Sequence, residues 1–269
     1  MAYESHLQSK KYFEHTAFVY HQRSHGLIYD FSSLIFQRRN DIVKKYLAKD
    51  IEKKIILDFG MGSGVFAEHC TENGYYYLGI DISPKMVELA QSLNLKNAEF
   101  KVGDIDSLIK YQGEMDYALA IGLIDYVEDP IKVIKLLKNC LKEDGHLIIS
   151  FRNRYSLPRF FRDTIKLIWK KILKNKITKS NKAFFSNVNE HSFDFSTQLL
   201  PVLRSLGFNS FTTKYFNCSP FFFNFPIKSR IWHKWYKLDS KLSGNLTRFF
   251  CSGCVVLANK VPKYKKCVQ

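Results

Sequence analysis

Acidic side chains are scarce in the second half of this 269-residue sequence. Residues 151–269 hold 4 Asp and Glu against 23 Lys and Arg, whereas residues 1–150 hold 21 against 18. The net charge of +16 therefore comes from the second half. We expect that half to face an anionic partner.

Long apolar runs are missing as well. No stretch reaches the roughly 18 uninterrupted apolar residues of a membrane-spanning helix, and residues 1–13 lack the apolar core of a signal peptide. We expect a cytoplasmic protein, and a peripheral position on the inner face of a membrane is the open alternative.

Metal-ligand patterns are sparse. The C-x-x-C pair of Cys251 and Cys254 has no second pair that would complete a four-ligand zinc site. His15, His21 and His25 do not have the spacing of a metal site either. We therefore predict that the six cysteines are reduced thiols and that the protein binds no metal.

Internal repeats and linkers rich in proline, glycine or serine are absent, so we predict a single domain over residues 1–269. Hydrophobic residues make up 46 % of the chain, enough for a substantial core. Residues 1–50 show helical periodicity. From residue 53 onward, short apolar runs alternate with helical patterns, which predicts an α/β fold with a parallel sheet.

Two dipeptides mark helix starts inside this alternating region. Ser83-Pro84 and Asp129-Pro130 each combine a capping side chain with a proline at the first helical position. Beyond the basic stretch we predict a helix at 195–207 and strands at 210–216 and 254–260.

The most informative motif is Asp58-Phe59-Gly60-Met61-Gly62-Ser63-Gly64, at the turn from the first strand into the first helix. Glycines there let the backbone approach a ligand closely, although the same loop also fits the dinucleotide pattern G-x-G-x-x-A. The glycine loop alone does not identify the ligand, so the acidic residues at the strand ends are the more informative signal. Asp81 can accept hydrogen bonds from both hydroxyls of a ribose, and Asp104 can accept one from the adenine amine.

At this point the sequence resembles the class I S-adenosylmethionine-dependent methyltransferases. The matching text is ILDFGMGSG, YLGIDISPKMVELA, FKVGDIDSL, MDYALAIGLIDYVEDP and LKEDGHLIISF, in the order of that family and over about residues 50–155. The resemblance implies a Rossmann-like, doubly wound sheet of order 3-2-1-4-5-7-6 with the last strand antiparallel, and S-adenosyl-L-methionine as cofactor.

The resemblance also implies a role for each motif residue. Around the cofactor it implies contacts with the methionine part (Asp58, Gly60, Gly62, Gly64), the ribose (Asp81), the adenine (Ile82, Met86, Asp104, Ile105) and the sulfonium side (Ile121, Gly122). Met61 stands where the family often has cysteine, a soft apolar exchange.

The N-terminal text KKYFEHTAFVY resembles the lid of small-molecule members of this family. Tyr12, Phe13 and Tyr20 would close over the cofactor, with core packing as the equal alternative. Arg38 and Arg39 could reach its carboxylate, but we expect an exposed helical pair. The chain then divides into a lid (1–50), a cofactor-binding half (51–155) and a basic, aromatic-rich acceptor half (156–269).

Methyl transfer to a hydroxyl benefits from a base that removes the proton of the acceptor. His191 is our first candidate because oxygen-methylating relatives can carry a histidine near this point, with a structural or exposed histidine as the alternative. Tyr126 and Asp125 follow the fourth strand toward the acceptor side, where Asp125 could instead cap a turn. Arg152 and Asn153 could contact an acidic or carbonyl group or lie in solvent.

The acceptor is predicted from the basic half. Apolar and basic residues alternate at helical spacing over 156–177, as in a helix lying on an anionic membrane, and solvation of the basic face is the alternative. The aromatic stretch 219–238 could line the binding site of a lipophilic acceptor or make a second membrane contact. We therefore favour a small-molecule acceptor that is lipid-like, quinone-like or a membrane-tethered glycan.

Two other classes of function remain open. An RNA methyltransferase would also use a basic, aromatic-rich surface. Amino-methylating nucleic-acid enzymes typically place an Asn or Asp, two prolines and an aromatic after the fourth strand, whereas residues 121–126 read IGLIDY and contain no proline. A non-catalytic cofactor-binding partner subunit is the third class, and the complete motif set argues against it. The sequence predicts neither the methylated atom nor the oligomeric state.

Overall fold

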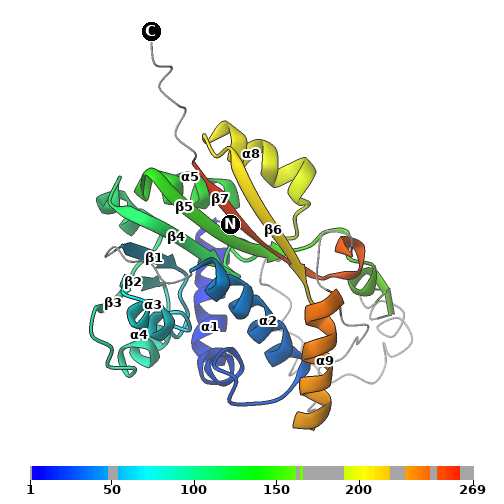
Figure 1. Ribbon diagram of the computed structural model, residues 1–269. Coiled ribbons are helices and arrows are strands. Elements are labelled where there is room, and N and C mark those ends of the chain that lie inside the picture. The colour runs from blue at the N-terminus through cyan, green and yellow to red at the C-terminus, as the bar shows by residue number, and fades with distance from the viewer. Residues whose placement is uncertain are drawn as a thin grey trace.

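The computed structural model describes residues 2–47, 54–161, 164–165, 191–218, 228–242 and 247–260, with residues 2–11 and 31 described by their backbone alone. Its centre is one seven-stranded sheet of order β3-β2-β1-β4-β5-β7-β6 (Figure 1). The strands are β1 (Ile55–Phe59), β2 (Tyr76–Asp81), β3 (Ala98–Val102), β4 (Met115–Ile121), β5 (Leu141–Arg152), β6 (Ser210–Phe216) and β7 (Gly253–Asn259). The predicted α/β sheet order is confirmed.

Strands β1 to β5 run parallel, and β7 is antiparallel to both of its neighbours. Because β7 enters between β5 and β6, the chain beyond β5 adds a hairpin-like pair to one edge of the parallel sheet. The described helical elements are α1 (Ala2–Ser24), α2 (Phe31–Tyr46), α3 (Ala67–Glu72), α4 (Pro84–Gln91), η1 (Ile105–Tyr111), α5 (Pro130–Cys140), η3 (Phe195–Leu199), α8 (Leu200–Ser205), α9 (Ser229–Leu242) and η4 (Arg248–Phe250).

The predicted helix starts are present. Ser83 caps α4 by accepting a hydrogen bond from the N–H of Met86, and Asp129 caps α5 by accepting one from Lys132. At the start of α2, Asp30 and Ser33 form a reciprocal capping box. The caps at Ser83 and Asp129 fix where α4 and α5 begin after β2 and β4, and so they fix the loops between these elements.

Helices cover both faces of the sheet (Figure 1). The core on one face joins the strands to α5, η3 and α8, and the core on the other joins them to α2, α3 and α4. Helix α1 packs on α2 and α4, and it lies at the edge where the parallel strands end. Among the described helices, none is both long and apolar enough to span a bilayer.

The cysteines depart from the prediction. Cys218 and Cys251 form a disulfide, so the expectation of six reduced thiols is wrong for this pair. Cys218 follows β6 and Cys251 precedes β7, and the antiparallel pairing of these strands brings their Cα atoms to 4.1 Å. The two cysteines are 33 residues apart in the sequence, and this separation does not predict that they are close in space. Cys70, Cys140 and Cys254 are buried free thiols, and Cys267 lies outside the described residues.

Candidate active site

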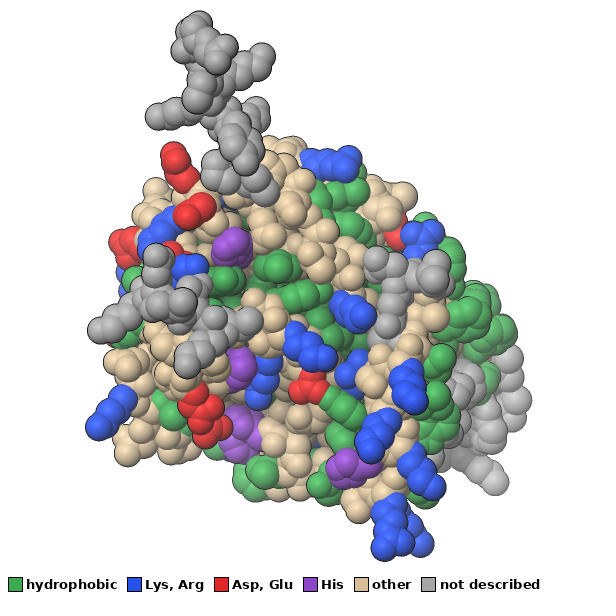
Figure 2. Space-filling model, viewed as in Figure 1, with side chains coloured by type: hydrophobic (Ala, Val, Ile, Leu, Met, Phe, Trp, Pro, Cys, Tyr) green, Lys and Arg blue, Asp and Glu red, His purple; other side chains and the backbone are tan. Residues whose placement is uncertain are grey.

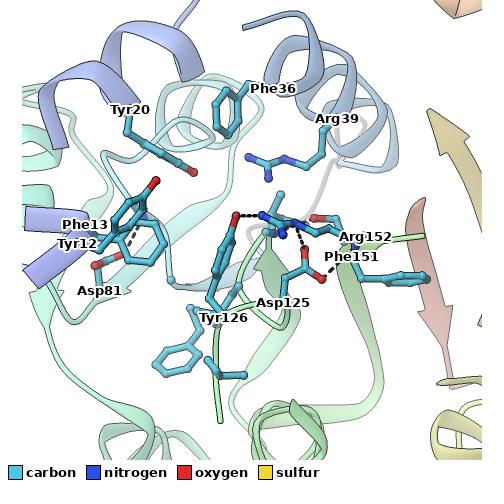
Figure 3. A pocket seen from close by; sticks show the side chains of 18 of the residues that line it. Tyr12, Phe13, Tyr20, Phe36, Arg39, Asp81, Asp125, Tyr126, Phe151 and Arg152 are labelled. Carbon is cyan, nitrogen blue, oxygen red and sulfur yellow. Dashed lines mark hydrogen bonds and ion pairs between the residues drawn. The ribbon is translucent and has the colours of Figure 1, made fainter. Parts of the chain in front are cut away.

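A cavity of about 1070 Å³ opens at the carboxyl ends of the parallel strands, beneath α1. This edge is where open α/β sheets bind their ligands. Figure 3 shows Asp81 at one end of the cavity, Asp125 and Arg152 at the other, and aromatic rings of α1 above Asp81. We describe the Asp81 end first and then the Asp125 end.

The glycine-rich loop forms the floor at the Asp81 end. Gly60 and Gly62 line the cavity with φ of +75° and +58°, a backbone region that other residues rarely adopt. A Cβ atom on Gly62 would come within 2.9 Å of the Tyr20 ring, and one on Gly60 within 2.8 Å of the Leu123 side chain. The predicted role of these glycines in close approach is therefore consistent with the geometry.

Asp81 is the polar anchor of this end. Its side chain is buried, and its carboxylate accepts hydrogen bonds from the main-chain N–H of Gly62 at 2.8 Å and of Ser83 at 2.9 Å. Burial raises the pKa of Asp81, while these main-chain hydrogen bonds oppose that shift. The carboxylate is thereby held in one orientation on the cavity wall.

Asp58 and Gly64 lie behind the loop and are not among the residues that line the cavity. The Asp58 carboxylate accepts a hydrogen bond from the Tyr77 hydroxyl at 2.6 Å, and burial raises its pKa to about 7. A Cβ on Gly64 would contact Ala90 at 3.2 Å. These two residues shape the loop from behind.

The remaining predicted cofactor residues lie on the cavity wall: Tyr20, Ile82, Met86, Asp104, Ile105, Ile121 and Gly122. Asp104 also caps η1, because its side chain accepts a hydrogen bond from the N–H of Asp106. The structure thus brings the ends of β2, β3 and β4 to one ligand-sized space.

Helix α1 closes this space from above. Tyr12, Phe13 and Tyr20 all line the cavity, as the lid prediction requires. The Tyr20 ring packs edge-on against Phe36 of α2 at 5.1 Å, and Phe13 packs edge-on against Tyr126 at 5.6 Å. Aromatic contacts therefore join the lid to both ends of the cavity.

Arg38 and Arg39 are buried, so the expectation of an exposed helical pair is wrong. Arg38 turns away from the cavity and forms an ion pair with Asp239 of α9 at 3.0 Å. Arg39 lines the cavity, its guanidinium lies 5.1 Å from the centre of the Phe36 ring, and its buried Nε has no hydrogen-bond partner among the described residues. Arg38 is buried against α9, and Arg39 lies beside Gly122 after β4. The pattern of α2 alone does not reveal either contact.

Polar side chains meet at the far end of the cavity. The Arg152 guanidinium donates a hydrogen bond to the Tyr126 hydroxyl at 2.5 Å, and the Arg152 main-chain N–H donates one to Asp125 Oδ1 at 3.0 Å (Figure 3). Burial raises the pKa of Asp125 to about 6, while Arg152, Arg159 and Arg39 oppose the shift. This end therefore holds a carboxyl group that titrates near neutrality beside a phenol and guanidinium groups.

His191 lies next to this cluster without joining the cavity wall. Its main-chain N–H donates a hydrogen bond to the Asp125 carbonyl at 2.7 Å. Its Nε2 is buried and has no hydrogen-bond partner among the described residues, and its side chain does not line the cavity. Asn153 is buried, and its amide donates hydrogen bonds to the Arg248 and Cys251 carbonyls, so it braces the loops and is not a solvated loop residue.

Part of the wall was not predicted. Phe216, Asn217, Ser252 and Gly253 line the cavity from the adjoining ends of β6 and β7. The Ser252 N–H donates to the Asn217 carbonyl at 3.0 Å, and the two side chains are also hydrogen-bonded to each other. No motif marks these residues, because the pairing of the last two strands brings them to the site. In the described ranges, no group of three or more His, Cys, Asp and Glu could hold a metal ion.

Comparison with known proteins identifies the family. The family model described as "Methyltransferase domain" matches residues 31–209, more than half of the chain. The chain belongs to this family. The predicted resemblance is confirmed, and the matched region of this methyltransferase-domain protein contains the glycine-rich loop, Asp81 and Asp104.

Curated relatives include a ubiquinone biosynthesis O-methyltransferase of Acinetobacter baumannii, 30 % identical over 106 residues. That match covers 38 % of this chain and 45 % of the relative, less than half of the length of each. It therefore compares parts of the two proteins.

Solved structures show the same fold. The magnesium protoporphyrin IX methyltransferase of Synechocystis with bound SAH aligns with a TM-score of 0.62 and 17 % identity, covering 94 % of this chain and 98 % of that one. A possible histamine N-methyltransferase of Thermotoga maritima aligns with a TM-score of 0.59 and 19 % identity, covering 93 % of this chain and 99 % of that one. Fold similarity therefore extends well beyond the 106 residues of the sequence match.

Proposed function

We propose that this methyltransferase-domain protein transfers a methyl group from S-adenosyl-L-methionine to a hydroxyl of a lipid-like or quinone-like small molecule. One observation carries the proposal: the cavity continues from the Asp81 end, which suits a nucleoside, to a second polar end at Asp125, Tyr126 and Arg152. Its volume of about 1070 Å³ lies at the upper end of the usual range for ligand sites. Two ligands side by side are what a group transfer requires.

The residues present fit this cofactor. Asp81 would accept hydrogen bonds from the ribose hydroxyls, Ile82 and Met86 would pack on the adenine, and Asp104 with Ile105 would contact its edge. Gly60 and Gly62 would pass beneath the methionine part, and Asp58 and Gly64 would hold that loop in shape. The buried Nε of Arg39, which has no hydrogen-bond partner among the residues described, supports a contact with the cofactor carboxylate. Tyr20, Ile121 and Gly122 would complete the wall.

The bound cofactor would supply an electrophilic methyl group on a sulfonium. The chain would hold the acceptor oxygen in line with that methyl group and exclude water, and α1 suits the second task because its aromatic rings cover the cavity. Tyr126 and Arg152 would orient the acceptor. His191 and Tyr126 stay our candidates for removing the proton of the acceptor hydroxyl, and Asp125 joins them because it lines the cavity.

The identity of the acceptor is supported by two observations. One curated relative is a ubiquinone biosynthesis O-methyltransferase, although the match covers less than half of each protein. The second half of the chain is strongly basic, which suits an acceptor held in an anionic membrane. We further propose a cytoplasmic, peripheral position. Of the segment 156–177 that we expected at the membrane, residues 162–163 and 166–177 lie outside the described part of the chain.

The proposal is tested by incubating the protein with methyl-labelled S-adenosylmethionine and a cell extract, followed by phase partition and nuclease digestion. Label in the organic phase is the expected result. Label that nuclease removes would replace the lipid-like acceptor with RNA. Absence of transfer in an assay where S-adenosylhomocysteine binds would favour a non-catalytic partner subunit.

A further inference from the structure

Helix α9 has three faces, and the residues of each face recur at helical spacing along the helix. Trp232, Tyr236 and Asp239 form the face that packs on α2. The Trp232 indole donates a hydrogen bond to Ser33 Oγ at 3.1 Å, and Asp239 pairs with buried Arg38 at 3.0 Å. These contacts fix the rotation of the helix about its axis, so its other faces cannot turn inward.

The second face is apolar and exposed. Ile231, Leu238 and Leu242 follow one another at seven and four positions, which places them in one stripe along the helix. Their exposed fractions are 47 %, 42 % and 43 %. Three large aliphatic side chains exposed along one side of a solvated helix are unusual.

The third face is basic and borders the apolar stripe. Arg230, Lys234, Lys237 and Lys241 are all exposed and repeat at the same helical spacing. The acid of this helix, Asp239, is buried in the ion pair with Arg38. Figure 2 shows Lys and Arg side chains gathered over α9, at the lower right of the view.

Two further segments carry exposed aromatic side chains, and hydrogen bonds tie one of them to the end of α9 and to the other segment. Thr247, which precedes η4, donates a hydrogen bond from its hydroxyl to the Leu242 carbonyl, and Phe249 and Phe250 of η4 are exposed. The amide of Asn153 donates to the Arg248 carbonyl at 2.6 Å, which ties η4 to the segment after β5. In that segment Arg159 lines the cavity, and Phe160 and Phe161 beside it are 66 % and 54 % exposed.

We propose that α9, η4 and residues 157–161 form one docking surface for a bilayer of anionic phospholipids, which we call the α9 surface. An interfacial helix carries an apolar stripe next to Lys and Arg, and exposed phenylalanines add insertion depth. Lysines beside the stripe would pair with the phosphate groups of the lipid headgroups. The aliphatic side chains would insert to the boundary between the headgroups and the acyl chains. The surface reaches the Asp125 end of the cavity through Arg159, so a bilayer there would lie against the acceptor end. The inference does not depend on which molecule is methylated.

The test is co-sedimentation of the full chain with vesicles of phosphatidylcholine alone and of phosphatidylcholine with phosphatidylglycerol. The wild type is expected to bind the second kind much more tightly. The variant K234Q/K237Q/K241Q is expected to lose about a hundredfold in partition to phosphatidylglycerol vesicles, since each lysine at an anionic surface contributes roughly fivefold. The variant I231S/L238S/L242S is expected to bind more weakly while it keeps its preference for anionic lipid.

The matched control is K85Q/K96Q/K135Q, which removes three exposed lysines remote in sequence from α9 and leaves the α9 surface intact. It is expected to bind like the wild type. Unfolding temperature and S-adenosylhomocysteine affinity are measured for every variant. The lysine variants are expected to match the wild type in both, because their side chains are exposed. I231S/L238S/L242S is expected to unfold at a lower temperature with unchanged affinity, since more than half of each aliphatic side chain is buried. These readouts also separate failure of this proposal from failure of the methyltransferase proposal.

Three results would overturn the inference. The first is a wild type that ignores phosphatidylglycerol vesicles. The second is equal loss of binding in the control and the α9 variants, which would reveal a general charge effect. The third is retention of vesicle binding by the α9 variants together with loss of binding to a labelled single-stranded RNA, which would make α9 a nucleic-acid surface.

Discussion

At the scale of single residues, Asp81 offers the sharpest test of the cofactor end. Two main-chain N–H groups hold its carboxylate on the cavity wall. Replacing Asp81 with alanine should weaken S-adenosylhomocysteine binding by about 1.5–3 kcal/mol, the scale of hydrogen bonds to a charged group. Titration calorimetry measures this, with Asp106→Ala as the control because exposed Asp106 does not line the cavity. Equal affinities of wild type and Asp81→Ala would contradict the ribose assignment.

His191 and Asp125 compete for the role of base. If His191 removes the acceptor proton, His191→Ala should lower kcat by about 10² or more and leave cofactor affinity unchanged. Asp125→Asn should then act mainly on acceptor KM. The reverse pattern, with a slow Asp125→Asn enzyme and a fast His191→Ala enzyme, would assign the role to Asp125. The measurement is steady-state transfer to the acceptor that the labelling experiment reveals.

Asp125 also makes stability depend on pH. Its folded pKa is raised to about 6 by burial, from an ordinary value of 3.8. A raised carboxyl pKa means that the folded state binds the proton more tightly, so this stabilisation is complete below about pH 4 and is lost as pH rises through about 6. Relative to Asp125→Asn, the wild type should lose roughly 3 kcal/mol of unfolding free energy over that window. Urea titrations of both proteins at several pH values measure the difference, and parallel curves would contradict it.

At the scale of secondary-structure elements, a buried ion pair joins Arg38 of α2 to Asp239 of α9. Asp239 also accepts hydrogen bonds from the main-chain N–H of Asn217 and Cys218. Asp239→Asn leaves Arg38 buried with no counter-charge from Asp239 and should cost about 3–5 kcal/mol of unfolding free energy. Guanidinium unfolding measures this, and Lys241→Gln on the exposed face of the same helix is the control. A loss of less than 1 kcal/mol would be too small for a buried ion pair.

The disulfide joins the end of β6 to the approach to β7. Replacing both Cys218 and Cys251 with serine should lower the unfolding free energy by about 2–4 kcal/mol, because the crosslink restricts the unfolded chain. Reductant should destabilise the wild type to a similar extent and leave the double variant unaffected. Under denaturing, non-reducing conditions four of the six cysteines should react with a thiol reagent. Six reactive thiols would contradict the pairing.

At the scale of the whole molecule, α1 lies over a cavity that the cofactor must reach. Binding of S-adenosylhomocysteine should therefore slow amide hydrogen exchange in α1, since its aromatic side chains would then pack on a ligand. Amides of α8, none of whose residues lines the cavity, should exchange at unchanged rates. Equal protection of both helices, or of neither, would contradict a lid. Exchange followed by mass spectrometry distinguishes these results.

The sequence alone predicts those parts of the site that come from one short segment of the chain. Each cofactor motif lies within a few residues of one strand end, so its position follows once the parallel sheet is predicted. Burial of Arg39 and the wall residues Asn217 and Ser252 depend on contacts between segments far apart in the chain, and no local pattern encodes them. The predicted aromatic stretch 219–238 overlaps α9, and its residues 219–227 lie outside the described part of the chain. The buried face of α9 follows only from the packing of this helix on α2.

The insertion of β7 between β5 and β6 sets an order of assembly. During synthesis β6 leaves the ribosome before β7, and in the final sheet β6 pairs with β7 alone. Strand β6 therefore has no partner until residues 253–259 arrive, whereas β1 to β5 can pair as they appear. Until then β5 and β6 both present open backbone edges, which are templates for aggregation. A nascent chain of this protein is most vulnerable in that interval, when the cofactor end can already be complete and the acceptor end cannot.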